Sequence, residues 1–356
     1  MAPRERTRRR LQRKWAARAA ALSLVAGLAT ACGGGSGSSS ASGTATGASS
    51  QPVDITIVDG STAASAILPY YAQTAGIFKK YNINATVKFV GAPLAMPELG
   101  SGKAQFGALG APQPEEVGQS GSGVKWLGVW DQLSNFQLVV GPGIHSVADL
   151  KGKAIGISTV GSVTNTFAMW VLQKHNLAPN AARYVPLQSS SGIVSGFIGG
   201  QVDALLLSPP NSTKAAKGRA GSSVLLSTDT PDYAWPFNGL AGNMAWVESH
   251  KDATVRVMEA MTEALKEFRT DSAGAEKAIA AAVPGTPADE VEASYKSALS
   301  VFATGSLAPS ATTEKQVLTL ITQFYPGQYP NATPDKFANF IDASYAQQAE
   351  AALKQG

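Results

Sequence analysis

The alternation of short apolar runs with helical stretches between Val53 and Ser208 restricts the fold of this chain more than any other feature. The β-type runs are VDITIV (53–58), ATVKFV (85–90), AQFGALG (104–110), VKWLGVW (124–130), FQLVVG (136–141), KAIGIS (153–158), RYVPL (183–187) and VDALLLS (202–208). Helical stretches separate several of them: one reaches about Lys80, and others cover 95–100, 163–174 and 192–198. Strands joined through helices form right-handed βαβ units, so the pattern predicts an α/β fold with mainly parallel sheets.

One short pattern occurs in both halves of the chain. LGSGKAQFG (99–107) and FIGGQVDAL (197–205) each combine a helix end with glycine, a polar residue and the start of a buried strand. Two similar α/β lobes explain this repetition, although a glycine-rich α/β chain can also show it by chance. Beyond Val247 the periodicity is helical, over 250–269, 275–282, 287–299, 312–324 and 336–353, which predicts a helical C-terminal extension.

The N-terminal residues have the organisation of an export leader. A basic region ends at Arg18, an apolar run covers 19–31, and Cys32, the single cysteine of the chain, follows directly. The apolar run is shorter than the roughly 20 residues that a membrane-spanning helix needs. LATAC (28–32) resembles a bacterial lipobox, although Ala29 occupies the usual leucine position. We therefore predict a signal peptide over 1–31 and lipidation of Cys32, with a plain secretory signal and an incidental cysteine as the alternative.

The segment from Gly33 to Pro52 contains neither a charged residue nor a large apolar one. This composition is typical of a flexible tether that holds a folded body away from a membrane. We expect residues 32–52 to form the lipidated cysteine and this tether. TRRRL (7–11) also resembles a twin-arginine export signal, so the general secretory and the twin-arginine routes both stay open.

The net charge of +4 arises from the leader. Eight of the 29 Lys and Arg residues lie in the first eighteen positions, with only one of the 25 acidic residues, so 21 basic and 24 acidic residues remain. A body with this balance lacks the dense basic surface that a phosphate backbone requires. Nucleic acid is therefore excluded as a partner.

No recognisable catalytic or metal-binding motif is present in the sequence. None of the three histidines, His145, His175 and His250, has another His or Cys at ligand spacing. The chain lacks G-x-S-x-G, H-E-x-x-H and a complete phosphate-binding loop. We expect no enzyme activity, no cofactor and no metal, while a catalytic group assembled from distant parts of the chain stays open.

Small hydroxyl residues and glycines gather in the loops that follow the predicted strands. These loops contain GST (60–62), LGA (109–111), STVGS (158–162), SSSG (189–192) and SPPN (208–211). Ligands of open α/β sheets lie beyond the carboxyl ends of the strands, where the free N–H groups of helix starts meet them. Each loop alone is compatible with an ordinary helix cap. Together they predict a binding cleft, with 158–162 as its strongest element.

Trp130 and Asp131 stand where the chain leaves its first half. An aromatic wall with a carboxylate at this point could hold an amine or a ring. A simple packed hinge is an equally good interpretation of the same two residues. The tyrosines Tyr70 and Tyr71, in the first helix, are interpreted as core residues.

Three phrases carry a resemblance to a known family: AGIFKKYNI (75–83), DLKGKAIGI (149–157) and GQVDA (200–204). With the lipobox, they make the region 53–249 resemble periplasmic-type solute-binding proteins of the nitrate/sulfonate/taurine and thiamine-precursor branch. The resemblance implies a two-lobed, type II-like periplasmic-binding-protein fold with hinge crossovers near 130–135 and 236–241. It places 53–130 plus 241–356 in the first lobe and 133–235 in the second.

The resemblance also implies which residues face the cleft and what the cleft is for. The cleft residues are Ser61, Thr62, Gly110, Trp130, Ser158, Thr159, Gly161, Ser162, Ser190, Ser208 and Asn238, with Asp131 added as the neighbour of Trp130. Because these loops contain no Lys or Arg, an anion would be held by N–H groups and hydroxyls alone. The implied function is capture of a small solute (sulfonate, nitrate, taurine-like or heterocyclic) by a membrane-anchored monomer that serves an ABC permease and its ATPase. An extracellular enzyme on the same fold and a signalling receptor are the alternatives.

Overall fold

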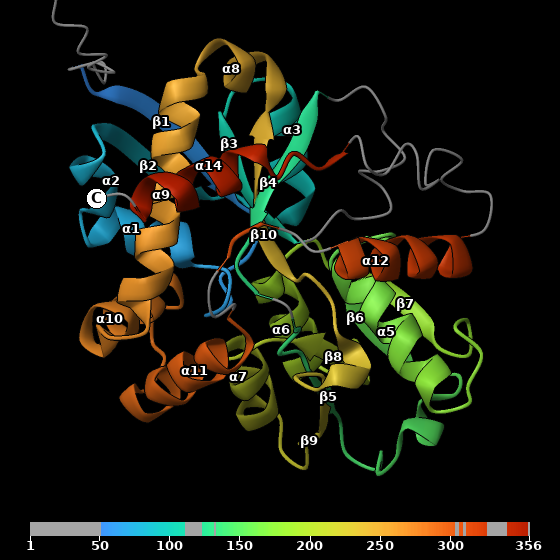
Figure 1. Ribbon diagram of the computed structural model, residues 1–356. Helices are drawn as coiled ribbons and strands as arrows, with labels where there is room; N and C mark the ends of the chain where they lie inside the picture. The colour runs from blue at the N-terminus through green and yellow to red at the C-terminus, as the bar shows by residue number, and fades with distance from the viewer. Residues whose placement is uncertain are drawn as a thin grey trace, which may run out of the picture. The chain divides into compact units, whose positions relative to one another are not determined.

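The computed structural model describes residues 51–110, 123–131, 133–302, 306–308, 311–325 and 340–354. The predicted signal peptide, Cys32 and nearly all of the tether lie outside these residues. The described chain forms two mixed five-stranded sheets with helices packed against them (Figure 1). None of the helices in these ranges is both long enough and apolar enough to cross a membrane.

The first sheet has the strand order β2-β1-β3-β10-β4. Its strands are β1 (Val53–Asp59), β2 (Ile83–Phe89), β3 (Phe106–Gly110), β4 (Val124–Val129) and β10 (Asn238–Asn243). Strand β1 pairs in parallel with β2 and β3, and Ile57 lies opposite Phe106 in this register. Strand β10 runs antiparallel to both β3 and β4, and all of its residues are buried.

The second sheet has the order β7-β6-β8-β5-β9. Its strands are β5 (Gln137–Val140), β6 (Ala154–Ile157), β7 (Arg183–Pro186), β8 (Ala204–Leu207) and β9 (Ser223–Ser227). Strand β6 is parallel to β7 and β8, whereas β5 is antiparallel to β8 and β9. Strands β6 and β8 are buried along their whole length, which accounts for their unbroken apolar sequences.

The expectation of mainly parallel sheets is wrong for half of the strand pairings. Both antiparallel strands follow a crossover between the sheets: the chain passes from β4 to β5 and later returns from β9 to β10. Parallel neighbours need a helical crossover on their own sheet, whereas a strand that arrives from the other sheet has no such constraint. The two crossovers therefore give each sheet its mixed character.

Eight helices of the described chain accompany the first sheet. They are α1 (Leu68–Thr74), α2 (Ile77–Lys80), α3 (Ala92–Gly100), α8 (Met244–Ser249), α9 (Lys251–Phe268), α10 (Ser272–Ala282), α11 (Ala288–Val301) and α14 (Ser344–Leu353). Helix α9 lies at the centre of their packing, since α1, α2 and α14 all contact it. It buries Val257, Met261, Leu265 and Phe268 at helical spacing. Each such side chain stabilises the lobe by about 1.5–3 kcal/mol.

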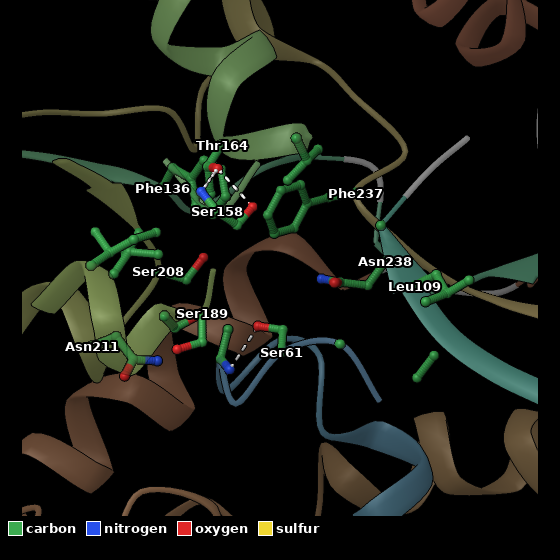
Figure 2. A pocket seen from close by; sticks show the side chains of 18 residues that line it. Ser61, Leu109, Phe136, Ser158, Thr164, Ser189, Ser208, Asn211, Phe237 and Asn238 are labelled. Carbon is green, nitrogen blue, oxygen red and sulfur yellow. Dashed lines mark hydrogen bonds between the residues drawn. The ribbon is translucent and has the colours of Figure 1, made fainter. Parts of the chain in front are cut away.

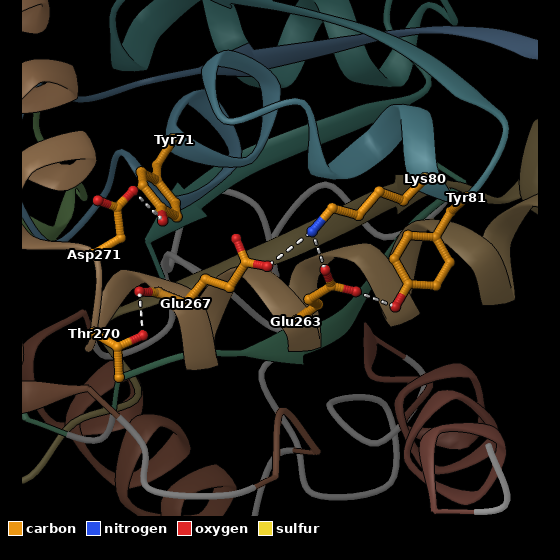
Figure 3. A network of polar contacts seen from close by, with 7 residues as sticks. All are labelled: Tyr71, Lys80, Tyr81, Glu263, Glu267, Thr270 and Asp271. Atoms are coloured by element: carbon orange, nitrogen blue, oxygen red, sulfur yellow. Dashed lines mark hydrogen bonds and ion pairs between the residues drawn. The ribbon is translucent and has the colours of Figure 1, made fainter.

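A polar network joins α2 to α9 on the outside of this lobe (Figure 3). The ammonium group of Lys80 contacts Glu263 at 2.6 Å and Glu267 at 2.8 Å, and the hydroxyl of Tyr81 donates to Glu263 at 2.5 Å. Burial and the hydrogen bond to Glu263 raise the pKa of the Tyr81 phenol. Lys80 is half exposed, so solvent weakens its ion pairs. We infer that this network holds the short helix α2 in place but stabilises the lobe much less than the apolar core does.

The second sheet is covered by η1 (Val147–Leu150), α5 (Val163–Lys174), α6 (Ser190–Ile198), α7 (Asn211–Gly218), η2 (Pro231–Tyr233) and α12 (Ala311–Phe324). The aromatic rings of Phe136, Phe167, Trp170 and Trp235 form the centre of its core. Helix α12 packs against α5, and Leu320 is buried in this same core. The sequence-based division placed all of 241–356 in the first lobe; α12 instead packs on the second, because its apolar face covers α5.

Candidate ligand-binding site

A cavity lies between the two lobes, beyond the carboxyl ends of strands from both sheets (Figure 2). Its volume is about 70 Å³. The lining residues are Gly60, Ser61, Ala63, Ala108, Leu109, Gly110, Phe136, Ser158, Val163, Thr164, Ser189, Ser190, Ile193, Leu207, Ser208, Asn211, Phe237 and Asn238. This mixture of apolar walls and a few hydroxyl and amide groups is typical of a site for a small organic molecule.

The loop after β1 forms the first-lobe side of the cavity. The Asp59 carboxylate accepts a hydrogen bond from the Ser61 N–H at 2.9 Å, and the Ser61 hydroxyl oxygen accepts one from the Ala63 N–H at 3.1 Å. Two short polar side chains therefore hold the turn by bonding to their own backbone, as Asp and Ser often do. Burial raises the pKa of Asp59 well above its usual range, and its second oxygen, Oδ2, is buried without a partner.

The start of α5 forms one second-lobe wall. Ser162 caps this helix: its hydroxyl oxygen accepts from the Asn165 N–H, and its proton goes to the Thr159 carbonyl at 2.7 Å. Thr164, in the first turn, accepts from the backbone N–H of Ser158 at 2.9 Å. The loop 158–162 is thus folded by its own hydroxyl groups, and Ser158 lies against the cavity.

The start of α6 forms a second wall. Ser189 is the N-cap, and its hydroxyl oxygen accepts from the Gly192 N–H at 3.1 Å. A Cβ atom at Gly192 would lie only 2.2 Å from the Leu187 carbonyl oxygen, so this turn requires glycine. The close approach keeps Ser189 and Ser190 at the cavity surface, with the helix N-terminus behind them.

The two lobes contact each other around the cavity. The Ala64 N–H donates to the Pro209 carbonyl at 3.2 Å, and the Asn211 amide donates to the Thr62 hydroxyl at 3.3 Å. Lys217 on α7 forms an ion pair with Glu290, a buried residue on α11. Helices and loops of both lobes thus contact each other around the cavity.

Asp131 joins the two crossovers at the back of the cavity. Its carboxylate accepts hydrogen bonds from the backbone N–H groups of Phe237, at 2.9 Å, and Asn238, and from the Asn238 amide at 2.6 Å. Burial raises the pKa of Asp131 well above its usual range, although these donors act in the opposite direction. This fully buried side chain therefore fixes Asn238 at the cavity wall.

Six of the residues expected at the cleft line the cavity: Ser61, Gly110, Ser158, Ser190, Ser208 and Asn238. They come from six separate loops or strand ends, which the fold brings together. As ligand contacts they remain predictions. Thr62 lies just outside, in an adjoining groove that also contains Ser61 and Ser190.

The other expected residues support the site instead of lining it. Gly161 donates its N–H to Asn165, and Thr159 has a buried hydroxyl without a partner. The Trp130 ring is 1% exposed and lies in the first-lobe core, with its indole N–H donating to the Ser65 carbonyl at 2.8 Å. The structure therefore favours the packed hinge over the aromatic wall, because the ring turns away from the cavity into the core.

Several lining residues were not among those expected. Ser189 and Asn211 lie in the hydroxyl-rich loops, so the same signal could have included them. Phe136, Ile193 and Leu207 are apolar residues of buried elements, and nothing in their sequence context separates a cavity wall from ordinary core. Among the described residues, no group of three or more His, Cys, Asp or Glu side chains could hold a metal ion.

Residues 64–275 match the family model described as NMT1/THI5 like. The match covers more than half of the chain and includes all of the cavity lining except the loop that contains Gly60, Ser61 and Ala63. The chain belongs to the NMT1/THI5-like family. Proteins named as binding proteins in Brucella abortus and Brucella suis are 26% identical to it over 203 residues, or 56% of this chain. The match spans 61% of the length of these relatives, less than two thirds.

Solved structures of similar fold include several binding proteins. The alkanesulfonate-binding protein of Xanthomonas axonopodis superposes with a TM-score of 0.68 at 20% identity, over 83% of this chain and 99% of that one. The periplasmic nitrate-binding protein of Synechocystis gives 0.69 at 10% identity, over 86% and 90%. A ligand-binding component of an ABC-type import system from Staphylococcus aureus gives 0.67 at 14% identity, over 84% and 99%. These likenesses establish the two-lobed α/β periplasmic-binding-protein fold that the sequence predicts.

Proposed function

We propose that this protein is the solute-binding component of an ABC import system, which captures a small organic solute by closure of its two lobes. The observation that carries the proposal is the cavity at the junction of the lobes, lined from both sides by hydroxyl, amide and apolar groups. The names of the curated relatives and of the solved structures support the same assignment.

Closure follows from the way the cavity is built. A solute that touches Ser61 on one lobe and Ser158 or Ser208 on the other gains contacts only when the lobes are together. Such a solute shifts the population toward the closed form by its difference in affinity for the two forms. The closed form then presents a defined surface to a membrane permease.

The site is proposed for binding and not for catalysis. Its described lining contains serine, threonine and asparagine, but no histidine, cysteine or carboxylate to transfer a proton or attack a bond. His250, one of the three histidines, stacks on Trp246 at 4.4 Å on the surface of the first lobe.

Anchoring through Cys32 completes the proposal. A signal peptide over 1–31, a diacylated cysteine and the tether would place the folded body at the outer face of the cell membrane, beside the permease. Cells given radiolabelled palmitate should incorporate label into the wild-type chain and not into the Cys32→Ser variant. Equal labelling of both chains would contradict the anchor.

Binding itself is tested on the detergent-purified full chain. Thermal unfolding and tryptophan fluorescence are followed while sulfonates, nitrate, amines, polyols and heterocycles are added at up to 10 mM. We expect at least one class to raise the melting temperature saturably, because a solute that binds only the folded state stabilises it. Failure of all classes would contradict the small-solute function.

A further inference from the structure

Three polar side chains of the cavity lining have their protons engaged within the protein. They are Ser158, Ser208 and Asn238, and we call them the acceptor wall. Figure 2 shows Ser208 and Asn238 pointing from opposite sides toward the centre of the cavity, with Ser158 beside them. The direction of each hydrogen bond around them can be assigned from partners that have only one possible role.

Asn135, on the first crossover, determines whether the Ser208 hydroxyl presents a proton or only lone pairs to the cavity. The Asn135 amide nitrogen faces the Ser297 hydroxyl at 3.1 Å and the Ser297 carbonyl at 3.5 Å, and a carbonyl can only accept. The Asn135 oxygen therefore points the other way, where it accepts from the Ser208 hydroxyl at 2.5 Å and the Ser65 hydroxyl at 3.2 Å. Since a hydroxyl has one proton, Ser208 keeps only lone pairs for the cavity.

The same reasoning applies to Asn238. Ser65 has given its proton to Asn135, so its oxygen accepts from the Asn238 amide at 3.3 Å. The other amide proton of Asn238 goes to Asp131 at 2.6 Å. Both N–H bonds of the side-chain amide are thus used inside the protein, and the side-chain oxygen of Asn238 is the group left to accept a hydrogen bond from a solute.

Ser158 is fixed by a chain of hydroxyls at the start of α5. Ser162 donates to the Thr159 carbonyl at 2.7 Å, so the 2.9 Å contact between Ser162 and Thr164 requires Thr164 as the donor. Thr164 then has no proton left, and the 3.1 Å contact between Ser158 and Thr164 requires Ser158 as the donor. Ser158 also keeps only lone pairs for the cavity.

We propose that the solute carries at least one N–H or O–H group that donates to this acceptor wall, so that nitrate and simple alkanesulfonates bind more weakly than donor-bearing solutes of similar size. The inference rests on the proposed function and narrows its substrate class. No Lys, Arg or His occurs among the described lining residues to offset the lone pairs of such an anion. An oxyanion oxygen against the acceptor wall would leave two sets of lone pairs facing each other without a proton.

Donors remain on the other surfaces of the cavity. Among the described residues, the hydroxyl proton of Ser61 has no acceptor, and the first N–H groups of α5 and α6 lack partners within their helices. An acceptor or acidic group of the solute is accommodated there. The predicted ligand is therefore a small molecule, neutral, cationic or zwitterionic, with its amine, amide or hydroxyl end toward the acceptor wall.

Pairs of probes that are similar in size but differ in hydrogen-bond donors test this orientation on the detergent-purified full chain. Nitrate is compared with urea, and ethanesulfonate with 2-hydroxyethanesulfonate and taurine, by calorimetry and thermal shift up to 50 mM. Urea, 2-hydroxyethanesulfonate and taurine carry an N–H or O–H donor, whereas nitrate and ethanesulfonate carry none. We expect the donor-bearing compounds to bind about tenfold more tightly, which corresponds to about 1.4 kcal/mol for one hydrogen bond.

Variants locate the effect. Ser208→Ala and Ser158→Ala each remove one acceptor and should reduce the advantage of the donor-bearing probe, whereas Ser249→Ala, on the outer surface of α8, should leave it unchanged. The wild-type comparison stands even where a variant fails to fold. Equal or tighter binding of nitrate or ethanesulfonate would overturn the inference and leave the binding function intact. Failure of every probe would contradict the proposed function, and the inference with it.

Discussion

Asp131→Ala tests whether the two crossovers are held together by one buried carboxylate. In the wild type this side chain accepts from the N–H groups of Phe237 and Asn238 and from the Asn238 amide. Alanine leaves these donors buried without an acceptor, at about 1–3 kcal/mol for each unsatisfied group. The variant also no longer has to bury a carboxylate, which offsets part of this loss. We expect the free energy of unfolding to fall by about 2–4 kcal/mol.

The pH dependence of this loss has a definite sign. Burial raises the pKa of Asp131 in the folded protein above its unfolded value, so folding takes up a proton. The contribution of this group to stability is fully present below the unfolded pKa of about 3.9 and is lost as the pH rises toward the folded value. Because the variant has no such group, the difference in stability between wild type and variant should shrink as the pH rises.

Urea denaturation at pH 5 and pH 8 measures both effects. Asp232→Ala, at a highly exposed aspartate on the surface of the second lobe, is the control and should change stability by less than about 0.5 kcal/mol. A loss below about 1 kcal/mol for Asp131→Ala would refute the role of the carboxylate. A loss that grows with pH would refute the assigned direction of the pKa.

Two further substitutions test the loops that line the cavity. Gly192→Ala should lower stability by about 2–3 kcal/mol, because the new Cβ would lie 2.2 Å from the Leu187 carbonyl oxygen; Gly199→Ala, with 3.2 Å to its nearest neighbour, is the control, and equal melting temperatures would contradict the argument. Asp59→Asn keeps an acceptor for the Ser61 N–H and removes a buried carboxyl whose pKa is raised, so it should increase the free energy of unfolding at pH 8 by about 1 kcal/mol and by less at pH 5. No gain at pH 8 would show that Oδ2 of Asp59 is not left without a partner in solution.

Helix and strand limits can be predicted from the sequence where a cap residue and the apolar periodicity agree. Helix α5 has the predicted limits, 163–174, because the Ser162 cap and the apolar residues behind it specify the same start. The family resemblance implies a crossover near 236–241, whereas Asn238–Asn243 form strand β10, whose sequence NGLAGN is rich in glycine and has weak β-propensity. Its glycines are required by crowding: a Cβ at Gly239 would lie 2.4 Å from the Gly128 carbonyl oxygen of the neighbouring strand.

The loops of the site were predictable, but the direction of individual side chains within them was not. Ser158 and Ser162 belong to one five-residue loop, yet Ser158 lines the cavity while Ser162 caps the helix. Trp130 stands at the end of β4, where either the cleft or the core could receive its ring. The carbonyl of Ser65, 65 residues away, decides between them by accepting the indole proton.

The sequence by itself determined that two α/β lobes form and that hydroxyl-bearing loops end their strands, since helical and strand periodicity and helix caps act over a few residues. The tertiary structure alone decided that β5 and β10 run antiparallel and that α12 joins the second lobe. It also decided which hydrogen-bond partners surround the side chains of Ser158, Ser208 and Asn238. The hydrogen-bond partners behind Ser208 and Asn238 are Asn135, Ser65, Ser297 and Asp131, which meet only when distant parts of the chain pack together.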